Sequence, residues 1–168
     1  MINWCYYPKN LRADKISCAV VEVFSRVAEK IDSENNTLHS NEVLAVVSSG
    51  LFEVGFQVET GKAAQQKIHV PVLFGKNGTN ALSFEADAFY PEERYVIEVE
   101  AGRAVVNNQF LKDFFEACCM YDADYLCIAV RNVYKGKNDF EKVCTFFDAL
   151  YSSGRMSVPL KGVLIIGY

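Results

Sequence analysis

Two neighbouring segments near the middle of the chain alternate apolar and charged side chains, and this pattern restricts the fold more than any other feature. The segments are residues 84–89 (FEADAF) and 94–100 (RYVIEVE). Alternation with a period of two is typical of a strand that buries one of its faces. Residues 90–93 (YPEE) lie between the segments, and a polar stretch with a proline favours a turn. The pattern therefore predicts a β-hairpin.

The register of this hairpin follows from its apolar side chains, because a slip of one residue would turn every side chain to the other face. The residues predicted to share the buried face are Leu82, Phe84, Ala86, Ala88, Tyr95, Ile97 and Val99. The opposite face then carries four neighbouring carboxylates, Glu85, Asp87, Glu98 and Glu100. Like charges on adjacent strands are destabilising and raise each other's pKa. Arg94 and Arg103 would offset part of this repulsion and a hard divalent cation would offset more, whereas an ordinary solvated strand face is the alternative.

Length, composition and charge limit the class of protein. The 168 residues, of which 51% are hydrophobic, predict one domain with a packed core, made of an N-terminal helical region (1–50) and a sheet core (51–168). No apolar run reaches the roughly 20 residues that cross a bilayer. Residues 1–9 also lack the layout of a signal peptide, so we expect a cytoplasmic protein without membrane contact. The six cysteines form no CxxC pair, which disfavours a zinc site. The net charge of −4 means that any binding of nucleic acid would depend on local basic patches.

The remaining periodic segments predict the order of helices and strands. Apolar residues at steps of three and four predict helices at 13–31, 41–49, 104–121 and 140–151. We expect Ser40 to cap the second helix and Gly50 to end it. Alternating or continuous apolar runs predict further strands at 51–59, 70–74, 125–131 and 162–167. This order predicts an α/β fold, a central mixed β-sheet flanked by helices on both faces.

Charged residues outside the hairpin supply further candidates. Glu42 lies in the first turn of the second predicted helix, where it either interacts favourably with the helix dipole or joins Asp87, Glu98 and Glu100 as a fourth acidic group of the site. Two basic segments also lie beside predicted strands: residues 61–67 come after the strand 51–59, and residues 132–138 come after the strand 125–131. The lysines and arginine considered as contacts for an anionic substrate are Lys62, Arg103, Lys135 and Lys137.

Taken together, residues 41–131 resemble the PD-(D/E)XK nuclease superfamily, the fold of many restriction endonucleases. The resemblance depends on a helix carrying Glu42, then Asp87, ten intervening residues and the ExE sequence of Glu98 and Glu100, followed by a crossover helix and the buried strand 125–131. It implies a restriction-endonuclease-like, Mg²⁺- or Mn²⁺-dependent endonuclease. In that family role, Asp87, Glu98 and Glu42 would hold the metal, and Asp87, Glu98 and Glu100 would be catalytic. Arg103, Lys135, Lys137 and Lys62 would contact the substrate.

This chain departs from the family pattern at one position. Glu100 stands where the family has a lysine, as in the ExE motif of Bam/Bgl-type restriction enzymes. The identity of the general base therefore stays open between Glu100, a metal-bound hydroxide, and a lysine arriving from Lys62 or Lys67. The expected partner is nucleic acid, with DNA expected before RNA, and cutting both strands of a duplex would favour a homodimer.

The alternative is a non-catalytic domain, on a degenerate nuclease fold, that binds nucleic acid or protein. The lysine-to-glutamate change, the acidic composition and the small size all suit it. Other catalytic classes fit poorly, since the chain has no Walker-type phosphate loop and no GxSxG sequence.

Overall fold

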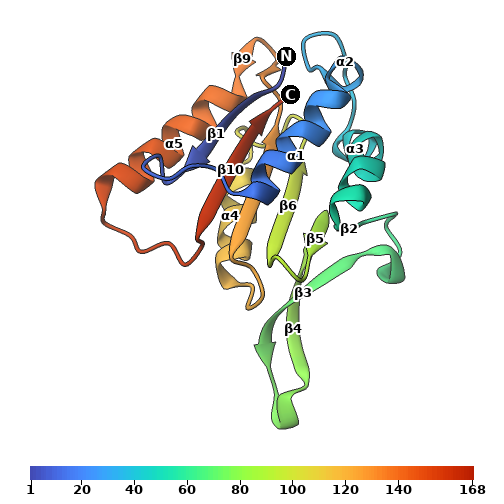
Figure 1. The fold of residues 1–168 in the computed structure, drawn as a ribbon, viewed down its shortest axis with the longest axis vertical. Coiled ribbons are helices and arrows are strands. Elements are labelled where there is room, and N and C mark those ends of the chain that lie inside the picture. Colours follow the sequence, from blue (N-terminus) through green and yellow to red (C-terminus); the bar gives the residue numbers. More distant parts are fainter.

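The computed structural model describes all residues 1–168 as a six-stranded mixed sheet with helices on both faces (Figure 1). The strand order is β1 (Asn3–Tyr7), β10 (Gly162–Gly167), β7 (Tyr125–Val130), β6 (Tyr95–Glu100), β5 (Ala88–Tyr90) and β2 (Gln57–Val58). Strands β6, β7 and β10 run parallel, and the outer strands pair antiparallel. The predicted α/β fold with a central mixed sheet is therefore confirmed.

Each face of the sheet is buried under its own helices. One layer holds α1 (Lys15–Arg26), α2 (Ala28–Ile31) and α3 (Ser40–Val54), and the other holds α4 (Gln109–Cys119) and α5 (Asp139–Ser153). Side chains of β7 alternate between the layers, with Cys127 and Ala129 packed in the α1–α3 layer and Leu126 and Ile128 in the α4–α5 layer. Burial on both faces explains why this strand is apolar without interruption. No helix combines the length and apolar character that a membrane span requires.

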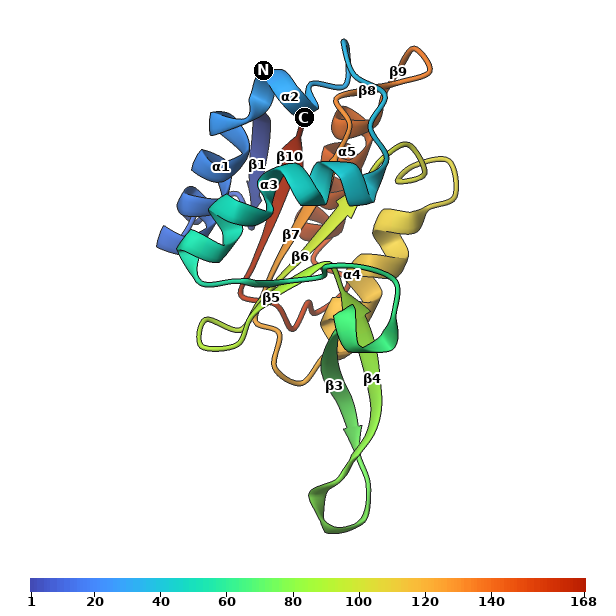
Figure 2. The same cartoon turned by 90° about the vertical axis from the view of Figure 1, so that its right-hand side faces the viewer.

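The first strand of the predicted hairpin is divided between two sheets. Strand β4 (Asn80–Ala86) pairs with β3 (Ile68–Phe74) in a separate two-stranded ribbon that projects from the body (Figures 1 and 2). Strand β5 continues the chain but pairs with β6, so only the second half forms the expected hairpin across residues 91–94. Ala86 packs in the α4–α5 layer and Ala88 in the α1–α3 layer. The predicted common face for the run from Leu82 to Ala88 is therefore wrong, because the chain breaks its strand geometry at Asp87.

Helix α3 also differs from the prediction. It continues through Gly50 and ends at Gly55, whose φ of 122° is a conformation open mainly to glycine. The predicted strand over 51–59 is wrong except at β2, and Phe52, within that range, lies on α3 and is 54% exposed. Gly50 has a packing role instead: a Cβ there would lie 2.7 Å from Cγ1 of Val23 on α1. The absence of a side chain lets α1 and α3 approach closely.

Other element boundaries in the structure also differ from the predicted ones. Helix α4 begins at Gln109 rather than 104, after Asn108 in a left-handed conformation (φ 52°). Val106 therefore lies before the helix and is 62% exposed. The single predicted helix 13–31 is two helices, separated at Val27. Strand β1, which was not predicted, lies at the sheet edge beside β10. The N-terminal region, residues 1–50, is therefore not purely helical.

Candidate functional site

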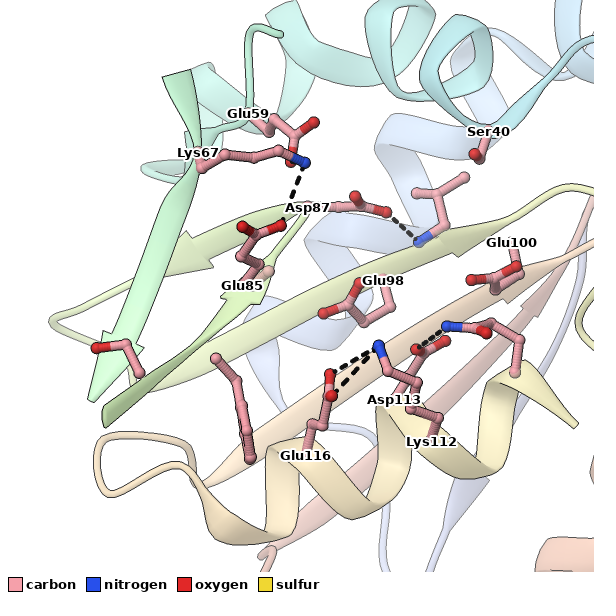
Figure 3. A pocket seen from close by; sticks show the side chains of 15 residues that line it. Ser40, Glu59, Lys67, Glu85, Asp87, Glu98, Glu100, Lys112, Asp113 and Glu116 are labelled. Carbon is pink, nitrogen blue, oxygen red and sulfur yellow. Dashed lines mark hydrogen bonds and ion pairs between the residues drawn. The ribbon is translucent and has the colours of Figure 1, made fainter. Parts of the chain in front are cut away.

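A pocket of about 380 Å³ lies between β4, β6 and α4, at the root of the projecting ribbon (Figure 3). Its lining is dominated by charge, with only two lysines, Lys67 and Lys112, to offset the acidic side chains. The acidic lining residues are Glu59, Glu85, Asp87, Glu98, Glu100, Asp113 and Glu116. The structure thus brings Asp87, Glu98 and Glu100, the three residues identified from the sequence, to one pocket.

Alternation along β6 places two of these carboxylates. Ile97 and Val99 are buried in the α1–α3 layer, so Glu98 and Glu100 point to the opposite face, toward α4 (Figure 3). The predicted face of Tyr95, Ile97 and Val99 is confirmed on this strand.

Asp87 reaches the pocket by a different route from the predicted one. It lies at the break between β4 and β5, and its Oδ2 accepts a hydrogen bond of 2.7 Å from the backbone N–H of Val99 (Figure 3). The Asp87 carbonyl accepts from the N–H of Glu59 at 2.8 Å. The Asp87 carboxylate therefore takes the place of a backbone acceptor that strand β5 does not offer to the Val99 N–H on β6.

Asp113 on α4 completes the acidic group and was missed in the sequence. Its side chain points to the sheet (Figure 3) and the residue is only 4% exposed. Oδ1 accepts from Nε2 of Gln109 at 3.1 Å, while Oδ2 is buried without a hydrogen-bond partner. A sequence feature was available: Asp113 lies on the same helical face as the apolar residues Phe110 and Ala117. An unpaired acid is rarely buried on such a face.

The electrostatic consequence of this crowding is a set of raised pKa values. Burial, joined by repulsion from neighbouring carboxylates, raises the pKa of Asp87 to about 6, of Asp113 to about 7 and of Glu100 to about 8. The same two causes raise the pKa of Glu98 well above its ordinary value. At neutral pH the pocket therefore either retains protons or needs added positive charge.

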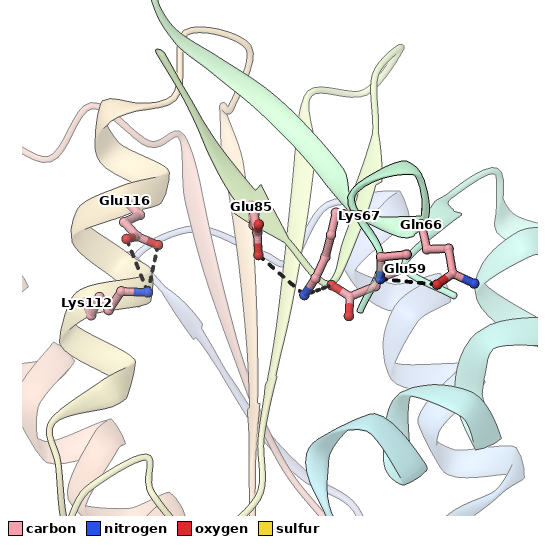
Figure 4. A network of polar contacts seen from close by, with 7 residues as sticks. Glu59, Gln66, Lys67, Glu85, Lys112 and Glu116 are labelled. Atoms are coloured by element: carbon pink, nitrogen blue, oxygen red, sulfur yellow. Dashed lines mark hydrogen bonds and ion pairs between the residues drawn. The ribbon is translucent and has the colours of Figure 1, made fainter. Parts of the chain in front are cut away.

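The two lining lysines are already engaged with acids at the rim (Figure 4). Lys67 Nζ lies 2.8 Å from Glu59 Oε2 and 3.3 Å from Glu85 Oε2, and Lys112 pairs with Glu116 at 3.2 Å. The hydrogen bond to Glu59 raises the pKa of Lys67, which favours a charge-compensating role over that of a base. Lys62, the other lysine considered as a base, does not line this pocket.

Glu42 lies outside the pocket. Its carboxylate accepts a hydrogen bond of 2.7 Å from the backbone N–H of His39 and so caps α3. The helix begins at Ser40, which does line the pocket, and His39 occupies the cap position predicted for Ser40. The arrangement agrees with the helix-terminus interpretation of Glu42 rather than with a metal ligand.

No group of three or more His, Cys, Asp or Glu side chains is arranged to hold a metal ion as the side chains stand. A cation held by Asp87 and Glu98 would therefore require rotation of side chains in the pocket. Hard divalent cations accept flexible sets of carboxylate oxygens and water, and the unpartnered Oδ2 of Asp113 would be a suitable further ligand.

The predicted substrate contacts separate into two groups. Arg103 and Lys135 line a second pocket, beyond the carboxyl ends of β6 and β7. Lys137, on β9 (Lys137–Asn138), and Lys62 line neither pocket.

Comparisons of this chain with protein-family models, with curated proteins and with solved structures give no match.

Proposed function

We propose that this protein is a metal-dependent nuclease that hydrolyses phosphodiester bonds, with DNA as the expected substrate. The observation that supports it best is the convergence of Asp87, Glu98 and Glu100 from two adjacent elements on one pocket. Burial and mutual repulsion both act against the charge of these acids, so their presence lowers the stability of the folded protein. Such a cost favours a functional role for the cluster over a structural one.

The donor set fits Mg²⁺ or Mn²⁺. All the candidate ligands are carboxylate oxygens, which hard divalent cations prefer. Asp87 and Glu98 would hold the ion, with Asp113 as an additional ligand. When bound, such an ion lowers the pKa of water and stabilises negative charge on the phosphate.

The other pocket residues have roles that follow from their charge. Glu100 shares the pocket with the proposed metal ligands, and a bound cation would favour its ionised form, which a general base requires. Glu100 would accept the proton of the attacking water. Lys67 and Lys112, at the rim, would face the phosphates of the bound strand.

The second candidate is a non-catalytic binding domain on the same fold. It is favoured by the lack of a preformed metal group and by Glu100 at the position of the family lysine. A cytoplasmic location and a two-fold homodimer belong to the nuclease proposal, because nucleic acid is found in the cytoplasm and a dimer would address both strands.

Cleavage assays with a near-isosteric variant separate the two candidates. We expect wild type to cut labelled DNA with Mg²⁺ or Mn²⁺ and not with chelator, and Glu98→Gln to be slower by about 100-fold or more. Glu42→Gln is the matched control, since that exposed carboxylate lies outside the pocket. The assay should include duplex and single-stranded DNA and RNA.

Two outcomes would reject the nuclease proposal. One is cleavage by Glu98→Gln at the wild-type rate. The other is a wild-type protein that neither cuts any of these substrates nor shows a shift in melting temperature with either metal, which would favour the binding domain.

A further inference from the structure

The second pocket, of about 760 Å³, has the opposite charge from the first. Its lining includes three cationic side chains, Arg103, Arg131 and Lys135, and a single carboxylate, Glu34. Arg103 follows the end of β6 and Arg131 follows the end of the neighbouring parallel strand β7. Ligands of α/β sheets bind outside the carboxyl ends of the strands. The position and charge of this pocket thus suit an anion.

Arg131 is the strongest reason to expect an anion. It is only 8% exposed, and its Nη2 donates a hydrogen bond of 2.5 Å to the carbonyl of Leu38. Neither Arg131 nor the other two cations forms an ion pair with a carboxylate. The Asp139 carboxylate interacts with Arg131 by charge without forming an ion pair, and the Tyr168 side chain forms a neutral contact with it. A buried guanidinium without a paired counter-ion is costly, and an anion in the pocket would supply the missing partner.

Tyr134 holds two of the cations together. The guanidinium of Arg131 and the ammonium of Lys135 each lie 5.3 Å from the centre of its ring, within the range of cation–π attraction. The ring in turn packs against Gly102, where φ is 97° and a Cβ would lie 2.5 Å from Cε2 of Tyr134. The backbone leaving β6 therefore positions the cationic rim.

The two pockets are neighbours. Glu100 lines the acidic pocket, and the next residue, Ala101, lines the basic one. Likewise, Ser40 lines the acidic pocket and the preceding residue, His39, lines the basic one. Consecutive residues lie about 3.8 Å apart along the chain. The two pockets therefore adjoin along the chain at two places, a separation suited to neighbouring phosphates of one ligand.

We infer that the basic pocket binds a phosphate group through Arg103, Arg131 and Lys135. Resting on the proposed nuclease function, this group is a backbone phosphate of the nucleic acid near the one at the carboxylates. A free phosphate ion shares the same chemistry and is the other source. Guanidinium and ammonium donors both form charge-assisted hydrogen bonds with phosphate oxygens.

Binding measured without cleavage tests this inference. Wild type, Arg103→Gln, Lys135→Gln and the control Lys137→Gln are titrated in chelator against a fluorescent single-stranded oligonucleotide, with inorganic phosphate as competitor. Inorganic phosphate is also titrated by itself in a calorimeter. Lys137 belongs to the same basic segment as Lys135 but lies outside the pocket. We expect each pocket variant to weaken binding about tenfold, the control by less than about twofold, and inorganic phosphate to compete with wild type.

The outcomes distinguish this inference from the nuclease proposal. Selective loss in the two pocket variants supports the phosphate site even if no protein form cleaves anything. Selective loss of inorganic phosphate binding, with oligonucleotide binding unchanged, assigns the pocket to the free ion. Equal weakening by all three substitutions would indicate diffuse surface charge and overturn the site, as would no weakening of either ligand.

Discussion

Asp87 combines a structural contact with its proposed role at the metal. Because its carboxylate accepts the N–H of Val99, a residue only 2% exposed, Asp87→Ala would leave a buried donor without a partner. We expect Asp87→Ala to lower the free energy of unfolding by about 1–3 kcal/mol. Asp87→Asn keeps an acceptor oxygen and should lose less than half as much, although both variants should lose cleavage. Urea unfolding at about pH 5, below the raised pKa of Asp87 (about 6) so that relief of its charge does not offset the lost hydrogen bond, checks this. Equal losses in the two variants would contradict the role of the hydrogen bond.

The raised pKa values of the pocket make the stability of the metal-free protein depend on pH. The folded pKa values of Asp87 and Glu100, about 6 and about 8, exceed those of an unfolded chain. At a pH between the unfolded and the folded values, the folded state therefore binds more protons than the unfolded state. The stabilisation from these groups is therefore complete below the unfolded pKa, near 4. It is lost as the pH rises through the folded values.

Replacing Glu100 by glutamine should reduce this dependence. In chelator we expect the wild-type melting temperature to fall from about pH 5 to about pH 9, and Glu100→Gln to fall less and to melt higher at the upper end. Glu100→Gln should also gain less from Mg²⁺ than wild type does, because it lacks a charge that the ion would neutralise. Identical pH and Mg²⁺ responses in the two proteins would remove Glu100 from the site.

At the scale of the elements, Gly50 tests the contact between α1 and α3. Alanine is a better helix former than glycine by about 0.8–1 kcal/mol, so Gly50→Ala would stabilise an isolated α3. The new Cβ would instead meet the stiff side chain of Val23, and overpacking costs about 1–3 kcal/mol. We therefore expect a net loss of stability in denaturant unfolding. In a Val23→Ala background, adding Gly50→Ala should change the free energy of unfolding less than it does in wild type, because the clashing side chain is gone. A stabilising Gly50→Ala in the wild-type background would contradict the close packing.

At the scale of the whole molecule, the ribbon of β3 and β4 stands apart from the six-stranded sheet (Figure 2). Its outer residues Leu73 and Phe74 are 56% and 50% exposed, and two-stranded hairpins are marginally stable by themselves. Strands β7 and β10, in contrast, are buried on both faces. We expect hydrogen exchange to be slowest in β7 and β10 and much faster at residues 73–82. Uniform protection would show that the ribbon is covered in solution.

Local pattern was sufficient where an element depends on its own neighbours. The period of two in β6 separated Glu98 and Glu100 from Ile97 and Val99, and the continuous apolar run of β10 predicted Gly162–Gly167 with the bounds that the structure has. The same period was misleading at 51–54, where α3 continues because Gly50 packs against Val23 instead of ending the helix.

Only the tertiary structure decided how these elements meet. The alternation around Asp87 suggested one strand, but pairing of β4 with β3 and of β5 with β6 divides it and turns that carboxylate to the pocket. Arg131 is an ordinary charge in the sequence, and the place of Asp113 in an apolar stripe does not say what it faces. The importance of both follows from burial against the sheet, which involves residues far away in the chain. Periodicity reports which face of an element is buried, because that depends on local geometry. It does not report which distant element covers that face, since this is settled by packing of the whole chain.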